Sequence, residues 1–271
     1  MKKLWPVIFL IGVWFIFASP YFFKGLVPFP SKYLVTFFPP WSAQYGMALK
    51  NNAMPDVVTQ IYPWKKITID SWKQGQVPLW NPYSFSGTPH AGNYQTAVFS
   101  PVNLFYFILP FLEAWSVSIL LQPLLAGIFM YFLLRSLDRS KEASLIGSTA
   151  FMFCGFLTVW MAYGTLGWAV LWLPLVFAAV RMHVNKRSWC YLVIIALSLM
   201  SSFFSGHFQM SVYVLLATVA FIIYQSFLTK RMREGIELVV AVVLGLMLST
   251  PQILPSLEAY NLSVRSELFT Q

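Results

Sequence analysis

The segment Trp115–Leu134 reads WSVSILLQPLLAGIFMYFLL, and none of its twenty residues is charged. About 20 mostly apolar residues allow an α-helix to cross the hydrocarbon core of a bilayer. Six further segments share this apolar character, although some are shorter: Leu4–Phe23, Ala143–Trp160, Leu166–Val180, Cys190–Phe204, Met210–Leu228 and Ile236–Thr250. The sequence therefore predicts an all-α polytopic membrane protein with about seven transmembrane helices, the last six forming a bundle over residues 115–250.

The composition of the whole chain agrees with this fold class. Of its 271 residues, 58% are hydrophobic and only 10% are charged, whereas a soluble domain carries about 25% charged residues. A soluble fold of this size could not bury so much apolar surface. The two cysteines, Cys154 and Cys190, lie in or beside apolar segments. A soluble enzyme, a disordered tail and a disulfide-stabilised scaffold are therefore excluded.

The first apolar segment, residues 1–23 with its basic start, resembles a signal peptide. Lys2 and Lys3 precede the apolar run, and Ala18 and Ser19 lie near its end. The run is long for a signal peptide, and other spans follow, so an uncleaved anchor is favoured. Either interpretation places the next segment outside the cell.

Most of the basic residues lie in short segments beside the apolar runs. The formal net charge is +9, and in a polytopic membrane protein such an excess arises from short cytoplasmic loops and indicates no nucleic-acid partner. Eleven of the 18 basic residues fall in four such pieces: Lys2, Lys3; Arg135, Arg139, Lys141; Arg181, Lys186, Arg187; Lys230, Arg231, Arg233. The pattern predicts a cytoplasmic N-terminus, an extracytoplasmic loop over residues 24–114 and an extracytoplasmic C-terminal segment over residues 251–271.

The long extracytoplasmic loop holds eleven of the 17 prolines. It is too long and too aromatic to be a disordered linker, so we expect it to fold against the membrane surface. Over residues 57–72, apolar side chains recur at roughly helical spacing, interrupted by Pro63, while Lys65, Lys66 and Asp70 point elsewhere. This pattern predicts short amphipathic helices that lie at the membrane interface.

Asp56 is the acidic residue with the most informative context. It follows Pro55 and opens the amphipathic run, so it could simply cap a helix N-terminus, for which aspartate is a preferred residue. It could equally serve as a general base if it faces a cleft. Asp70, between Ile69 and Ser71 in a lysine-containing stretch, is interpreted instead as part of a solvated helix face.

A second group of candidates follows in the same loop, within and after the stretch PLWNPYSFSGTP at residues 78–89. Prolines and glycines fix the backbone of this stretch, and aromatic faces suit sugar rings or lipid headgroups. A rigid structural loop is the alternative interpretation. The candidate substrate-binding side chains are Trp80, Asn81, Tyr83, His90 and Gln95.

Three candidates come from later outer segments. His207 and Gln209 lie in the tight turn between two spans, and Arg265 is the one arginine of seven expected outside. An arginine fork matches phosphate oxygens. His207 could hydrogen-bond at the interface, donate to an anionic group or bind a metal. Its spacing from Asp56 forms no compact metal motif.

Several blocks of this sequence together resemble a known family. They are Asp56–Trp64 (DVVTQIYPW), Gly75–Gly87 (GQVPLWNPYSFSG) with Pro89, Ala91 and Gln95, Gly206–Gln209 (GHFQ), and Pro251–Pro255 (PQILP) followed by Ser263 and Arg265. The chain resembles the bacterial YfhO-type membrane proteins of the GT-C superfamily of glycosyltransferases. Because members of that family are much longer, the chain is expected to be an N-terminal fragment.

The resemblance implies a function on the outer face of the bacterial cell membrane. A sugar would pass from a polyprenyl-phosphate carrier to a cell-envelope polymer or glycan, with Asp56 matching the family's critical acidic residue and Gln252 in a matching block. Mg²⁺ or Mn²⁺ could assist, held at Asp56 or His207. The alternatives are a non-catalytic lipid-carrier-binding protein or a flippase or transporter, although no predicted span carries a charge near its centre, which disfavours ion-coupled transport.

Overall fold

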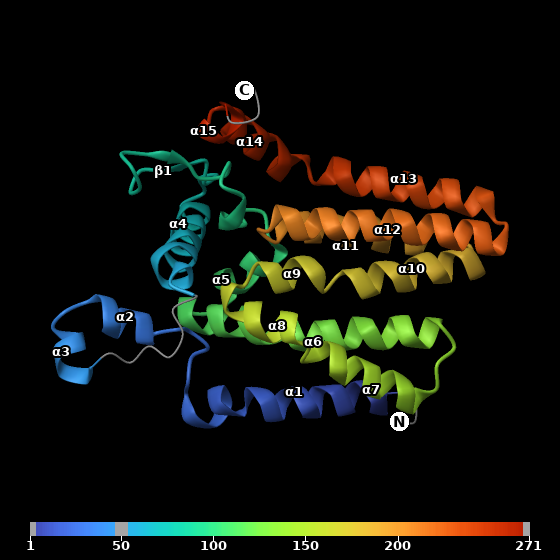
Figure 1. Ribbon diagram of the computed structural model, residues 1–271, viewed down its shortest axis with the longest axis horizontal. Helices are drawn as coiled ribbons and strands as arrows, with labels where there is room; N and C mark the ends of the chain where they lie inside the picture. The colour runs from blue at the N-terminus through green and yellow to red at the C-terminus, as the bar shows by residue number, and fades with distance from the viewer. Residues whose placement is uncertain (1–3, 47–53, 268–271) are drawn as a thin grey trace.

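The computed structural model describes residues 4–46 and 54–267 and is helical almost throughout, which confirms the all-α membrane fold. Long helices lie roughly side by side and form a bundle (Figure 1). The bundle consists of α1 (Trp5–Lys24), α6 (Phe111–Ser136), α7 (Lys141–Met152), α8 (Gly155–Trp160), α9 (Leu166–Val170), α10 (Leu173–Asn185), α11 (Trp189–Phe204), α12 (Phe208–Thr229) and α13 (Met232–Leu248).

The predicted spans correspond to these helices, with differences in length and continuity. In the described residues, five helical stretches are long and apolar enough to cross a membrane: Trp5–Lys24, Phe111–Ser136, Lys141–Tyr163, Leu166–Asn185 and Phe208–Thr229. Helix α13 and the following α14 (Thr250–Asn261) qualify as a sixth, bent by 60°. The seventh predicted span is α11, which has only 16 residues. The chain is therefore a multi-pass membrane protein.

Two predicted spans are broken rather than continuous. Ser140 is the N-cap of helix α7, and its hydroxyl accepts from the Ala143 amide at 3.1 Å; the helix ends at Met152. Cys154 is extended, and α8 starts after it. Helices α9 and α10 are separated by a turn at Leu171 and Trp172, and Pro174 lies in the first turn of α10. Broken backbone at membrane depth is tolerated where protein surrounds it. Leu171, between α9 and α10, is fully buried, whereas Cys154 is half-buried.

The two ends of the bundle differ in chemistry. One end carries the N-terminus and the α6–α7, α10–α11 and α12–α13 connections (Figure 1). These connections hold the arginine and lysine clusters recognised in the sequence, and we call it the basic end. The opposite end, called the loop end, carries the segment between α1 and α6 together with α14.

The loop end is built from short elements. They are α2 (Lys32–Phe37), α3 (Trp41–Tyr45), η1 (Val57–Ile61), α4 (Tyr62–Lys73), β1 (Trp80–Asn81), β2 (Thr88–Pro89), η2 (Tyr94–Thr96), η3 (Pro101–Leu104) and α5 (Phe105–Ile108), with α15 (Val264–Glu267) after α14. The helical spacing over residues 57–72 is confirmed, but Pro63 does not interrupt it. Pro63 lies in the first turn of α4, where a missing amide hydrogen costs nothing.

Helix α10 lies centrally and contacts α6, α11 and α12, while α1 contacts only α6 and α7 strongly. Helix α13 approaches α11 closely at Gly245, because a Cβ there would lie 3.0 Å from the Ala196 carbonyl oxygen and 3.1 Å from the Leu199 Cβ. Small residues allow such close packing between membrane helices. The close contact fixes α13, and through it the bend into α14.

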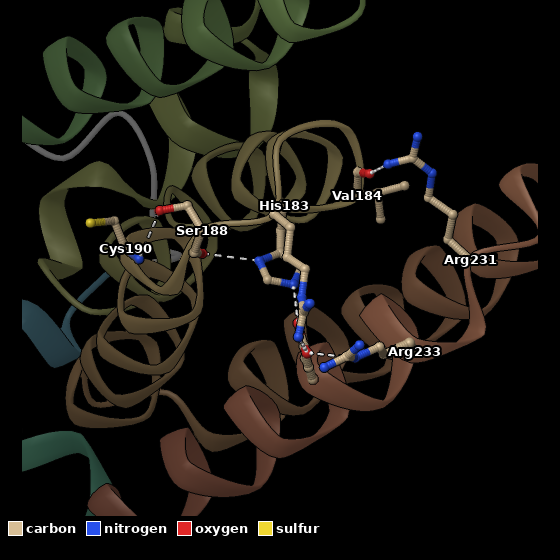
Figure 2. Close-up of polar contacts among 8 residues, drawn as sticks. His183, Val184, Ser188, Cys190, Arg231 and Arg233 are labelled. Atoms are coloured by element: carbon tan, nitrogen blue, oxygen red, sulfur yellow. Dashed lines mark hydrogen bonds and ion pairs between the residues drawn. The ribbon is translucent and has the colours of Figure 1, made fainter.

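At the basic end, Glu237 of α13 connects three elements, and Figure 2 labels its neighbours His183 and Arg233. Its carboxylate accepts from Arg187, lies 3.1 Å from His183 Nε2 and lies 3.7 Å from Arg233. His183 Nδ1 lies 3.0 Å from the Ser188 carbonyl oxygen, to which it donates. These contacts join the ends of α10, α11 and α13.

Candidate functional site

Asp56 lies at the loop end, directly before η1. Its side chain is half-buried and makes no capping hydrogen bond, so the helix-cap interpretation of this residue is not realised. Gln60 Nε2 approaches its Oδ1 at 3.5 Å. Within the described part of the chain, no lysine, arginine or histidine forms an ion pair with Asp56. The Asp56 carboxylate is therefore not committed to an ion pair in this part of the chain.

Tyr163, at the end of η4 (Met161–Tyr163), faces Asp56 and forms a side-chain hydrogen bond with it. Both residues adjoin an apolar cluster that includes Val57, Ile61 and Trp115. The sequence analysis missed Tyr163, because a tyrosine in an uncharged turn between two spans gives no signal by itself. The result is a carboxylate and a phenol at the border between polar and apolar surroundings.

An apolar groove opens between α1 and α6 near the loop end. Its volume is about 230 Å³, and its lining includes Trp14, Phe22, Leu109 and Val117. Two polar groups, Tyr21 and Glu113, also line it, and the Tyr21 hydroxyl donates to the Glu113 carboxylate. A groove of this character suits a hydrocarbon chain.

The predicted aromatic stretch forms a β-hairpin, with Trp80 paired to Pro89. Asn81 is buried, and its side-chain oxygen accepts from the Tyr83 amide at 2.9 Å while its nitrogen donates to Ser84. Asn81 therefore stabilises the turn. Trp80 and Tyr83 are 56% and 82% exposed and remain available for a ligand.

His90 is part of a polar cluster in which Thr68, His90 and Asn103 are buried and Lys65 is half-buried. His90 Nε2 lies 2.9 Å from Thr68 Oγ1, and Lys65 Nζ donates to Asn103 Oδ1 at 2.8 Å. Burial lowers the pKa of Lys65 to about 7. Burial and the nearby Lys65 charge lower the pKa of His90 to about 4. The ammonium group of Lys65 thus points into the folded loop, where Asn103 accepts its hydrogen bond, and not into solvent.

Gln252 attaches α14 to the same loop. Its Nε2 donates to the Ala91 carbonyl at 2.9 Å, whereas its buried Oε1 has no partner among the described atoms. Gly92 makes this approach possible, because a Cβ there would lie 2.6 Å from the Ala259 Cβ. Gln95 follows in the loop, and its side chain is exposed.

His207 is the N-cap of α12, and its Nδ1 accepts from the Met210 amide at 3.4 Å. Burial lowers the pKa of His207. Because Nδ1 accepts the Met210 amide, Nε2 is the ring nitrogen that carries a proton in the neutral tautomer. Gln209 is exposed and donates to the Tyr213 hydroxyl at 2.7 Å. The side chain of Arg265 lies outside the described residues.

The predicted site residues do not all lie together: several meet around one loop, and Asp56 is separate from them. His90 and Gln252 meet at the loop around Ala91, and the Gln95 backbone approaches Gly206 beside His207. No hydrogen bond or ion pair connects Asp56 with any other predicted site residue whose side chain is described. Among the described residues, no three histidine, cysteine, aspartate or glutamate side chains gather as a metal site.

This fold and this loop end define a polytopic membrane protein with an elaborate folded loop before its second span. The family model described as "Bacterial membrane protein YfhO" matches residues 88–269. The chain therefore belongs to the YfhO family. The match includes His90, His207 and Gln252 but begins after Asp56. No curated protein and no solved structure matches the chain.

Proposed function

We propose that the protein is a GT-C-type glycosyltransferase that moves a sugar from a polyprenyl-phosphate carrier to a cell-envelope acceptor. The observation that carries this proposal is Asp56, a half-buried carboxylate with no cationic partner among the described residues, beside Tyr163 at the edge of an apolar cluster. Membership of the YfhO family, which is GT-C-like, supports it. The reaction is proposed to occur on the outer face of the bacterial cell membrane.

In the proposed step, Asp56 removes the proton of an acceptor hydroxyl as that oxygen attacks the anomeric carbon of the donor. The bond between the anomeric carbon and the phosphate oxygen breaks, and the polyprenyl phosphate leaves with the electron pair. General-base assistance of this kind contributes about 10²–10⁴-fold to a rate. Tyr163 holds the carboxylate oriented.

Other residues have proposed supporting roles. The groove between α1 and α6 accommodates part of the prenyl chain. His207 Nε2–H donates to the leaving phosphate, because Nδ1 already accepts from Met210. The exposed rings of Trp80 and Tyr83 pack on sugar. Asp56 supplies a single carboxylate, so Mg²⁺ or Mn²⁺ would need donor-phosphate oxygens and water as its other ligands.

The test is transfer from a radiolabelled polyprenyl-phosphate sugar in membranes that contain the protein. Asp56→Asn should reduce transfer by about 10²–10⁴-fold while the protein accumulates normally. Asp70→Asn is the matched control, because Asp70 pairs with Lys66 at 2.6 Å on an exposed helix face, and it should retain activity. Near-normal turnover in Asp56→Asn would refute the base role. Retention of intact donor without discharge by the unaltered protein would identify a carrier-binding protein instead.

A further inference from the structure

A second groove lies at the basic end of the bundle, between α6, α10 and α11. Its volume is about 420 Å³, within the range of about 300–1,000 Å³ that is typical of ligand sites. The walls are formed mainly by the apolar side chains of Phe132, Leu175, Ala178, Ala179, Met182 and Ile194. Arg135, Ser136 and Tyr191 complete the lining. The groove therefore combines a long apolar wall with polar groups from the helix ends.

The position of the groove suits a membrane lipid. Arg135 lies in the last turn of α6, and Tyr191 lies in the first turn of α11, so the polar groups stand where helices leave the membrane. Trp189, two residues before Tyr191, is 71% exposed. Tryptophan and tyrosine are enriched at headgroup depth. An acyl chain could then follow the apolar wall toward the bilayer centre.

The charge at the groove comes from Arg135, the cationic side chain in its lining, and four other arginines at the basic end have partners elsewhere. Arg187 and Arg233 face Glu237, and Arg231 donates to the Val184 carbonyl oxygen (Figure 2). Arg181 donates to Gln225 at 3.2 Å. These four guanidinium groups hold helices together rather than a ligand.

Arg135 itself retains donors for a ligand. It donates from one nitrogen to the Arg139 carbonyl oxygen, and Glu142 acts on it electrostatically from α7. Its side chain is exposed, and no ion pair joins it to a carboxylate among the described residues. The remaining N–H groups of a guanidinium match two phosphate oxygens. The Tyr191 hydroxyl, which has no protein partner among the described atoms, offers a further donor.

We propose that this groove binds an anionic phospholipid, with the phosphate at Arg135 and one acyl chain along the wall formed by α6, α10 and α11. Basic pockets between transmembrane helices favour anionic headgroups over zwitterionic ones because the lipid contributes net negative charge. The site is separate from Asp56, and it does not depend on the proposed transfer reaction.

The experiment measures lipid retention by the purified protein in detergent, using native mass spectrometry after addition of phosphatidylglycerol or phosphatidylcholine with identical acyl chains. The unaltered protein should retain phosphatidylglycerol preferentially. Arg135→Gln should reduce that preference about fivefold, the effect of one basic group at a membrane surface. Arg135→Lys should keep most of it. Lys230→Gln, which removes the same charge from the same end but away from the groove, should leave it unchanged.

A second variant tests the apolar wall independently of charge. Ala178→Phe should lower retention of both lipids by filling the groove, while a melting curve reports whether the bundle still folds. Equal retention of the two lipids by the unaltered protein would overturn the proposal. The proposal would also be overturned if Arg135→Gln and Lys230→Gln retained phosphatidylglycerol with the same preference. That result would show that the lipid is an adventitious additive only.

Discussion

Replacing Lys65 by Met tests the polar cluster at the loop end. Burial lowers the pKa of Lys65 from 10.5 to about 7 in the folded protein. Between these values the unfolded chain binds one more proton than the folded protein does. The free energy of unfolding therefore rises with pH in this window, by at most about 1.4 kcal/mol per pH unit. From pH 7 to pH 9 the gain is about 2 kcal/mol.

Lys65→Met removes this titration but leaves Asn103 Oδ1 without its donor. At pH 7 the depressed pKa of Lys65 lowers the free energy of unfolding by about 4 kcal/mol, and Lys65→Met removes this penalty. The hydrogen bond that the variant loses costs about 1–3 kcal/mol. We expect Lys65→Met to be the more stable protein at pH 7, by about 1–3 kcal/mol. That advantage should shrink by about 2 kcal/mol at pH 9. His90 does not interfere, because its pKa of about 4 lies below this range.

The assay is reversible unfolding in mixed micelles of dodecyl maltoside and SDS, followed by tryptophan fluorescence at pH 7, 8 and 9. Lys66→Met is the control, since the Lys66 side chain is 53% exposed and pairs with Asp70. It should follow the pH dependence of the unaltered protein. If the difference between Lys65→Met and the unaltered protein stays constant from pH 7 to pH 9, the lysine is not held buried with a depressed pKa.

Two glycines give further predictions. Gly87 has φ of +118°, and a Cβ there would lie 2.3 Å from the Trp80 ring. Gly87→Ala should therefore lower the free energy of unfolding by about 1–3 kcal/mol and increase proteolytic cleavage within the hairpin. Unchanged cleavage would contradict the close packing. Gly245→Ile should force α13 away from α11 and cost about 1–3 kcal/mol, measured by SDS-induced unfolding. Gly12→Ala, where nothing lies within 4 Å, should be nearly neutral, and an equal effect of both substitutions would refute the helix-packing argument.

The breaks in the bundle illustrate what a sequence pattern leaves undecided. The apolar run over residues 143–160 predicts one span, yet the chain is extended at Cys154 and restarts as α8. Hydropathy reports only whether a residue tolerates the bilayer. It carries no information about whether the backbone stays helical, because neighbouring helices can enclose a break.

The loop end shows the same limit for polar residues. Helical spacing over residues 57–72 indicated the amphipathic run and placed Lys65 away from the apolar face, but it did not reveal the partner of Lys65. In the fold, Asn103 comes from a separate element and accepts from that ammonium group. Tyr163 reaches Asp56 in the same way, from the turn after α8. Such partners lie far apart along the chain, so no local spacing reveals them.

The sequence by itself determined the membrane class, the positions of the apolar segments and the segregation of basic residues. Each of these follows from the transfer of one segment at a time between water and hydrocarbon, which depends on local composition. Only the tertiary structure decided that Gln252 anchors α14 to the loop at Ala91, and that α6, α10 and α11 leave a groove beside Arg135. The physical reason is that polar contacts and grooves depend on how distant helices bend and pack against one another.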